Sequence, residues 1–346
     1  MSHLQRALRW IALFAIVVLA APAWAQPAAN SQELAQQQQQ RRIDQPGNNA
    51  PVWREVRSGR AQSTLVPGPE IGVLVLSSGQ TWRALHGGPI PLYGGGLLIV
   101  VVLAIAAYFL LRGTIELHGK PTGRLIQRFG SFDRIAHWST ALTFCIMAVS
   151  GLVILFGKMV LLPVTGHTLF SWLAALSKNV HNFVGLLFIL SLLATIVAFI
   201  RDNLPQAADF KWIATAGGLF GGREAPSGRF NAGEKGWFWI GVVFLGIAMG
   251  VTGVILLFPN FDQPRTTMQI ANIVHDIAAV LFIALGLGHI YMGTIGMRGA
   301  YQAMRTGFVD ETWAKEHHEL WYDDVKSGKV QARTQDAVLP DMQRQH

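Results

Sequence analysis

The sequence predicts an all-α membrane protein, a bundle of four transmembrane helices with one extra transmembrane helix before it. Of the 346 residues, 51% are hydrophobic and 14% are charged, whereas soluble domains carry about 25% charged residues. Five apolar stretches are each long enough to cross about 30 Å of hydrocarbon as a helix. Basic residues gather in alternate connecting segments, which is the charge pattern of a protein that crosses a membrane several times.

Residues 1–25 have the pattern of a secretory signal peptide. Arg6 and Arg9 form a basic start, a short apolar run follows, and Ala-Trp-Ala at 23–25 offers a cleavage site. We therefore expect the segment that follows to be exported. An uncleaved anchor helix is the alternative interpretation.

Residues 26–91 should form a periplasmic segment of low complexity. A run of glutamines fills positions 36–40, and such polar tracts bury too little apolar surface to fold. Residues 71–85 contain two β-prone runs around Ser-Ser-Gly, a pattern that favours a short β-hairpin. The extra transmembrane helix is expected at 92–112, which contains no histidine.

The other four spans belong to one domain, residues 125–325. Inside a bilayer the backbone can satisfy its polar groups only as a helix or a closed barrel, and the length of these stretches indicates helices. The four helices are expected at 135–157, 178–200, 236–258 and 270–295.

Loop charges predict the orientation. Basic residues gather in 112–134 and 201–235, whereas 158–177 and 259–269 carry few. The positive-inside rule therefore places the first two loops and the tail, 326–346, in the cytoplasm, with the mature N-terminus in the periplasm of a bacterial inner membrane. The net charge of +8 is explained by these loops beside membrane lipid, so we expect no nucleic-acid partner.

The cysteine count excludes several kinds of site. Cys145 is the single cysteine, and it lies inside an apolar span. An internal disulfide, a CxxCH haem attachment and a four-thiolate iron–sulfur cluster each need more thiols than this chain has.

Four of the eleven histidines lie within the expected spans, and their depths form two pairs. His181 and His275 lie near the periplasmic ends of their helices, whereas His137 and His289 lie near the cytoplasmic ends. His275 and His289 are 14 residues apart, which puts them on one helix face and about 21 Å apart. Two imidazoles from facing helices are what each of two stacked haems needs as iron ligands. Zinc would need about four converging ligands, and a proton relay would favour carboxylates at mid-depth.

Other polar residues leave two interpretations open. Arg128 and Arg134 could pair with haem propionates or serve as positive-inside anchors. His317 and His318 are adjacent and so point to different sides of a helix, which makes them poor chelators. We expect them in an amphipathic segment that docks under the bundle.

Seven motifs run in order over about 190 residues: FDRIAHW (132–138), VHNFVGL (180–186), FNAGEKGWFW (230–239), VTGVIL (251–256), VHDIAA (274–279), GHIYMG (288–293) and WAKEHHELWY (313–322). On these motifs the chain resembles the gamma, or cytochrome b, subunit of respiratory membrane-bound formate dehydrogenase. It resembles a long form of that subunit, with a signal peptide and the extra helix.

The resemblance implies a four-helix cytochrome b bundle that holds two haem b groups. His181 and His275 would ligate the iron of the periplasmic haem, and His137 and His289 that of the cytoplasmic haem. This agrees with the pairs given by depth.

The resemblance also implies a site for menaquinone or ubiquinone at the loop that enters the fourth span. Its candidate residues are Asn231, Gly233 and Glu234. From the residues alone, Asn231 is better explained as a helix N-cap or turn residue, and Glu234 as a helix N-terminal charge or a proton donor.

The function implied is electron transport in an anaerobic respiratory chain. Catalytic alpha and iron–sulfur beta subunits would deliver electrons on the periplasmic side, and quinone would be reduced on the cytoplasmic side. Formate would not be oxidised by this chain itself, because no molybdenum-binding or cluster-binding residues are visible in it. The alternatives are a di-haem cytochrome b subunit of another oxidoreductase, such as a membrane-bound hydrogenase, and a haem-free anchor or transporter.

Overall fold

The computed structural model describes residues 50–58, 77–215, 217, 225–261 and 263–336, together with positions 36, 37, 39, 40, 44 and 47. The predicted signal peptide therefore lies outside the described residues. By backbone contacts the chain forms two units, one of residues up to Pro89 with Val254–Val274, and one of Ile90–Gly253 with His275–His346.

The described elements, in chain order, are α3 (Ala50–Arg57), α4 (Ser77–His86), α5 (Pro89–Arg112), β1 (Arg124–Gln127), α6 (Ser131–Val160), α7 (Leu162–Phe199), α8 (Ala207–Ala214), α9 (Ala232–Gly236), the π-helical η2 (Trp237–Leu245), α10 (Gly246–Leu257), α11 (Arg265–Tyr291), the π-helical η3 (Met292–Gly296), α12 (Ala300–Thr306), β2 (Phe308–Asp310), α13 (Glu311–His317), α14 (Glu319–Lys326) and β3 (Thr334–Asp336).

Among the described residues, five helical stretches are long and apolar enough to cross a membrane, which confirms the all-α membrane fold. All five spans that the sequence predicts lie within them or end within four residues of them. They are Ser78–Arg112, Ser131–Val160, Leu162–Phe199, Ala232–Leu257 and Arg265–Gly296.

The hairpin predicted at 71–85 is wrong where the structure describes it, because Ser77–His86 is the helix α4. Serines are favoured at the start of a helix, and the Gln, Arg, Ala and Leu after Gly79 are good helix formers. Within its unit, α4 is held on the first turns of α11. The Ser78 hydroxyl donates to the Gln269 side chain at 3.1 Å, and the Trp82 indole to that of Asn272 at 2.8 Å. This long-range pairing is invisible in a local pattern.

The loop expected at 158–177 is also mostly helical. α7 begins at Leu162, and its one break is at Gly166, which has φ 72° and ψ 173°. Glycine reaches this conformation at little cost, so the chain turns there and resumes the helix. The residues that follow Gly166 contain no proline, and nothing in them stops the helix.

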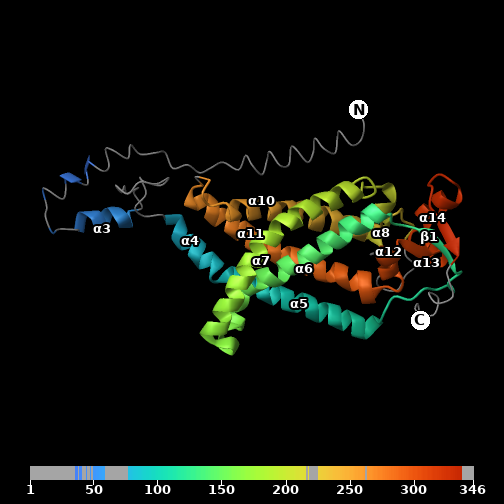
Figure 1. Ribbon diagram of the computed structural model, residues 1–346, viewed down its shortest axis with the longest axis horizontal. Helices are drawn as coiled ribbons and strands as arrows, with labels where there is room; N and C mark the ends of the chain where they lie inside the picture. Colours follow the sequence, from blue (N-terminus) through green and yellow to red (C-terminus); the bar gives the residue numbers. More distant parts are fainter. Residues whose placement is uncertain are drawn as a thin grey trace. The chain divides into compact units, whose positions relative to one another are not determined.

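The four helices of the second unit alternate in direction. α6 and α7 are antiparallel, since Thr140 contacts Thr195 at 2.8 Å while Ser150 contacts His181 at 2.9 Å. α11 runs with α7, and η2 with α10 runs with α6. Figure 1 shows these helices side by side with α5 along one side of them.

The extra helix α5 packs against α11. A Cβ placed on Gly94 would lie 3.0 Å from Val280, and Tyr108 and Phe109 meet Tyr291 edge to face at 6.3 and 6.4 Å. Its other side exposes many large apolar residues, as a lipid-facing helix should; they include Ile99, Val100, Leu103, Leu110 and Leu111.

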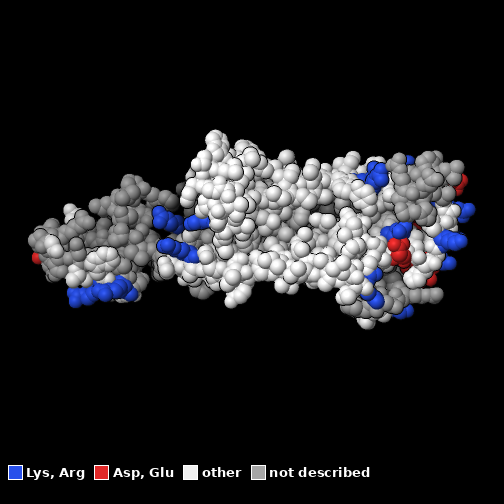
Figure 2. Space-filling model, turned by 90° about the horizontal axis from the view of Figure 1, so that it is seen from below, with Lys and Arg blue, Asp and Glu red and all other residues white. Residues whose placement is uncertain are grey.

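The loops that were predicted to share one side of the membrane meet in a single polar cap. The cap contains the three-stranded antiparallel sheet β2-β1-β3 together with α12, α13 and α14. On the face seen in Figure 2, acidic and basic side chains lie together at this end, basic side chains also lie toward the other end, and the surface over the middle of the helices shows none. The grouping matches the predicted loop pattern.

Candidate functional site

The two histidine pairs predicted from depth are present in the second unit. The ring centres of His181 on α7 and His275 on α11 are 6.2 Å apart. The ring centres of His137 on α6 and His289 on α11 are 6.1 Å apart. Helix α11 therefore supplies one imidazole to each pair, and a different neighbour supplies the other.

These separations fit an iron atom between the two rings. A metal–imidazole bond is about 2.0 Å, and the ring centre lies ~1.2 Å behind the nitrogen, so two trans imidazoles on one iron have centres ~6.4 Å apart. Among the described residues, no group of three or more His, Cys, Asp or Glu side chains could hold a metal ion. A zinc site therefore finds no ligand set in the part of the chain that the structure describes, whereas two-ligand haem sites do.

Hydrogen bonds fix the tautomer of the first pair. Nδ1 of His181 lies 2.9 Å from the Ser150 hydroxyl, and Nδ1 of His275 lies 2.9 Å from the Thr252 hydroxyl. Each hydroxyl donates its one hydrogen to the carbonyl four residues earlier in its own helix, at 2.8 and 2.6 Å. Each Nδ1 must therefore carry the proton, because the hydroxyl can only accept from it. The lone pair at Nε2 is left for a metal.

The second pair is held differently. Nδ1 of His137 is buried without a hydrogen-bond partner among the described residues. His289 stacks on Trp237, with ring centres 4.8 Å apart and planes within 13°. The Trp237 indole packs directly on Gly241. A Cβ at that position would lie 2.5 Å from the ring, so a larger residue there would displace the indole.

An aromatic cluster separates the two pairs. Phe282 lies seven residues from each α11 histidine, on the same helix face, and is 3% exposed. Its ring meets Phe144 at 4.8 Å, Trp237 at 5.7 Å and Phe188 at 6.3 Å. The sequence interpretation missed Phe282, although its equal spacing from both histidines is a signal for it.

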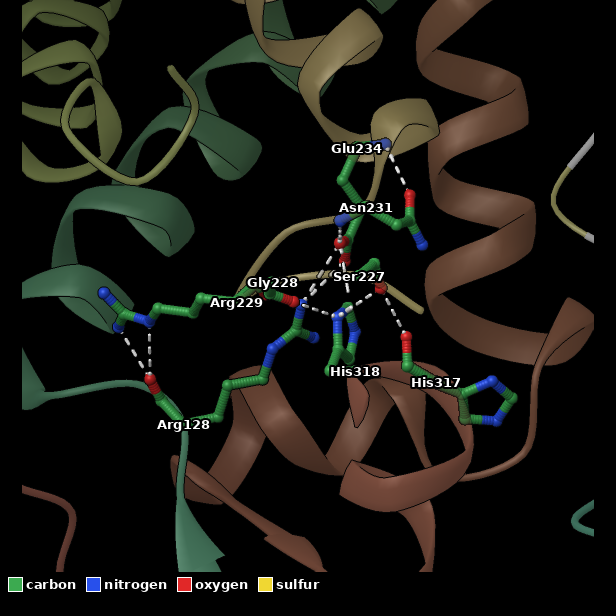
Figure 3. A network of polar contacts seen from close by, with 8 residues as sticks. All are labelled: Arg128, Ser227, Gly228, Arg229, Asn231, Glu234, His317 and His318. Carbon is green, nitrogen blue, oxygen red and sulfur yellow. Dashed lines mark hydrogen bonds and ion pairs between the residues drawn. The ribbon is translucent and has the colours of Figure 1, made fainter. Parts of the chain in front are cut away.

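The loop expected to bind quinone begins with a helix cap. Asn231 Oδ1 accepts from the Glu234 backbone N–H at 2.9 Å, and the Glu234 carboxylate accepts from the Asn231 N–H at 2.9 Å (Figure 3). This reciprocal capping box is the N-cap interpretation of Asn231. α9 continues directly into η2, so the loop is one turn away from the indole that stacks on His289.

Glu234 also forms the centre of a partly buried ionic network. Its carboxylate pairs with Arg128 at 2.9 Å and lies 3.9 Å from Nε2 of His318 (Figure 3). The Arg128 side chain is 4% exposed, and it also donates to the Arg229 carbonyl at 2.7 Å. Arg128 therefore has a protein carboxylate as its partner, while Arg134 donates to the Thr306 carbonyl at 3.0 Å.

His318 docks the C-terminal cap onto the same loop. Its Nδ1 donates to the Gly228 carbonyl at 2.9 Å, and the residue is 1% exposed. Burial, with the nearby Arg128 guanidinium, lowers the pKa of His318 from 6.5 to about 3, so its ring is neutral at pH 7. The prediction that the two adjacent histidines dock beneath the bundle agrees with this burial.

Gly233 meets an aromatic ring of the protein itself. A Cβ on Gly233 would lie 2.7 Å from the ring of Trp212 on α8. The two helices are joined by an ion pair in which Lys235 contacts Asp209 at 2.9 Å, and both side chains are buried. α8 therefore forms one wall of the loop.

Comparison with known proteins agrees with this geometry. Residues 128–307 match the prokaryotic cytochrome b561 family, and this range contains all four histidines. The chain belongs to that family. As a member, it is a multi-pass membrane cytochrome b, a protein that binds b-type haem and transfers electrons.

Three similar proteins are named as cytochrome b556 subunits of formate dehydrogenases. The cytochrome b556 subunit of a formate dehydrogenase from Escherichia coli K12 is 32% identical over 58% of this chain and 93% of its own length. The nitrate-inducible cytochrome b556 subunit from the same organism is 28% identical over 62% and 98%. A Haemophilus influenzae cytochrome b556 subunit of formate dehydrogenase is 26% identical over 57% and 82%. The resemblance expected from the motifs is confirmed at this level.

Proposed function

We propose that this cytochrome b is the membrane subunit of a formate dehydrogenase, and that it carries electrons from periplasmic catalytic and iron–sulfur partners to quinone. The proposal is supported by relatives of that name, each matched over more than four fifths of its own length. The observation that carries the proposal is the presence of two imidazole pairs, whose ring centres are 6.1 and 6.2 Å apart.

In this proposal each histidine pair holds one haem b, and the iron, when bound, supplies a one-electron redox centre. His181 and His275 hold the periplasmic haem, and His137 and His289 hold the cytoplasmic haem. The rigid helix α11 sets their spacing at about 21 Å along its axis. Phe282 and its aromatic neighbours keep the space between them dry and close-packed.

The quinone site is proposed at Asn231, Gly233 and Glu234. The loop is next to the helix that contacts His289, and the Trp212 ring packs against it at Gly233. The capping contacts of Asn231 and Glu234 hold the loop in shape. Reduction of quinone takes up protons, which come from the cytoplasm in the proposed orientation.

The signal peptide, residues 1–25, and the placement of the mature N-terminus in the periplasm and of the tail in the cytoplasm are part of the same proposal. They are supported by the loop charges and by the single cap that contains the basic loops.

The test is quinol oxidation by the purified complex. Quinol should reduce the haem of His137 and His289, and Asn231→Ala should keep the haem spectrum but lower the rate of quinol-driven haem reduction at least tenfold. Thr143→Val is the control and should react like the wild type, because among the described residues the Thr143 hydroxyl contacts the Ser139 and Thr140 carbonyls and the Ser191 hydroxyl. An Asn231→Ala rate equal to the control would remove Asn231 from the quinone site.

A further inference from the structure

The two histidine pairs differ in the hydrogen-bond partner of Nδ1. In the pair His181 and His275, each Nδ1–H donates to a buried hydroxyl, that of Ser150 or Thr252, at 2.9 Å. In the other pair, Nδ1 of His137 is buried without such a partner among the described residues.

This difference has an electronic consequence at the metal. A hydrogen bond donated by Nδ1–H pushes electron density toward Nε2 and makes the imidazole a more basic ligand. A more basic axial ligand stabilises ferric iron relative to ferrous iron and so lowers the reduction potential. The Ser150 and Thr252 hydroxyls are themselves polarised in the favourable sense, because each donates its hydrogen to a helix carbonyl.

In the second pair, Nδ1 of His137 has no such acceptor among the described residues, and His289 makes a different contact. His289 is held by the face of the Trp237 indole, which orients the ring without accepting a proton from it. The ligand set of His137 and His289 is therefore less basic, and the ferrous state costs less there.

We infer that Ser150 and Thr252 make the His181–His275 centre the lower-potential haem of the two, so that an electron moves downhill from it to the His137–His289 centre. The inference rests on the proposed function, because it needs a haem in each pair. It assigns the direction of transfer inside the subunit to two hydroxyl groups. Ser150 and Thr252 are positioning residues that act through the imidazoles.

The test is a spectroelectrochemical titration of the purified holo-complex. The wild-type titration should show two haem components of equal size. His275→Ala should lose one of them, and the lost component is thereby assigned to the His181–His275 centre. Ser150→Ala and Thr252→Val should each raise the potential of the lower component and leave the higher component unchanged. Ser150→Thr and Thr252→Ser keep the hydroxyl and should keep both potentials.

The matched control is Thr143→Val on α6. Its hydroxyl also bonds back to its own helix, but in the described part of the chain its side-chain partner is Ser191 at 3.1 Å and not a histidine. The control should leave both potentials unchanged.

The outcomes separate the inference from the proposed function. A wild-type complex without two haems would overturn both. Two haems whose potentials ignore Ser150→Ala and Thr252→Val, or move together by the same amount, would overturn the inference alone. Ser150→Ala and Thr252→Val could instead both lose the haem, with no recovery in Ser150→Thr and Thr252→Ser. That result would show that the two side chains act in packing, and it would also overturn the inference.

Discussion

Replacing Arg128 by methionine should loosen the polar cap. Arg128 pairs with Glu234 at 2.9 Å, donates to the Arg229 carbonyl at 2.7 Å, and lies over the rings of Phe129 and Trp313 at 4.8 and 5.1 Å. The substitution leaves the Glu234 carboxylate without its cation, and breaking a buried pair in this way costs about 3–5 kcal/mol.

The lower end of that range applies here. The Arg128 side chain is 4% exposed but that of Glu234 is 35% exposed, so water reaches the carboxylate and screens it. We therefore expect a loss of about 3 kcal/mol in the free energy of cap opening. The double variant Arg128→Met with Glu234→Gln removes both charges and should recover part of the loss, because the two residues form one coupled pair.

Hydrogen exchange read by mass spectrometry measures this opening directly. Exchange in β2, α13 and α14 should rise about a hundredfold, since 1.4 kcal/mol corresponds to a factor of about ten. Arg124→Met is the control, because Arg124 is 64% exposed and lies 3.6 Å from Glu311, and it should change exchange by less than fivefold. Equal exchange in Arg128→Met and Arg124→Met would refute the claim that the Arg128–Glu234 pair holds the cap closed.

Two further predictions concern His318 in the polar cap and Gly233 in the loop that it contacts. Because the folded pKa of His318, about 3, lies below the unfolded value of 6.5, the folded cap binds fewer protons; its stability is fully present above pH 6.5 and is lost as the pH falls from 6.5 toward 3. Proteolysis of the cap should accelerate over this window in the wild type and much less in His318→Asn, and identical pH profiles would contradict the account. Gly233→Ala should press on Trp212, where a Cβ would come within 2.7 Å, and weaken quinol oxidation with the haem content unchanged. Trp212→Leu in the same chain should relieve the clash; a Gly233→Ala protein with wild-type affinity for quinol would show that the ring is free to move.

The spans and the histidine pairs could be predicted because the bilayer limits the possible structures. Apolar length, loop charge and helical spacing together assign a depth to each histidine, and depth alone gives the pairing of His181 with His275 and of His137 with His289. That these imidazoles ligate haem iron stays a prediction, favoured because a neutral imidazole brings no charge into the bilayer.

Other features depend on contacts that are distant in sequence. The helix α4 is held by Gln269 and Asn272, about 190 residues further on, so its local pattern was misread. Arg128 and Glu234 are 106 residues apart, and no local pattern connects them. The hydroxyls of Ser150 and Thr252 are ordinary in sequence and become informative only when the imidazoles beside them are known.

The central claim is that four imidazoles hold two haems, and counting haem per chain tests it most directly. Pyridine haemochrome analysis with quantitative amino-acid analysis should give two haem b per wild-type chain. His275→Ala and His289→Ala should each give one, and each should lose a different component of the redox titration. Two haems in either variant, or none in the wild type, would contradict the assignment.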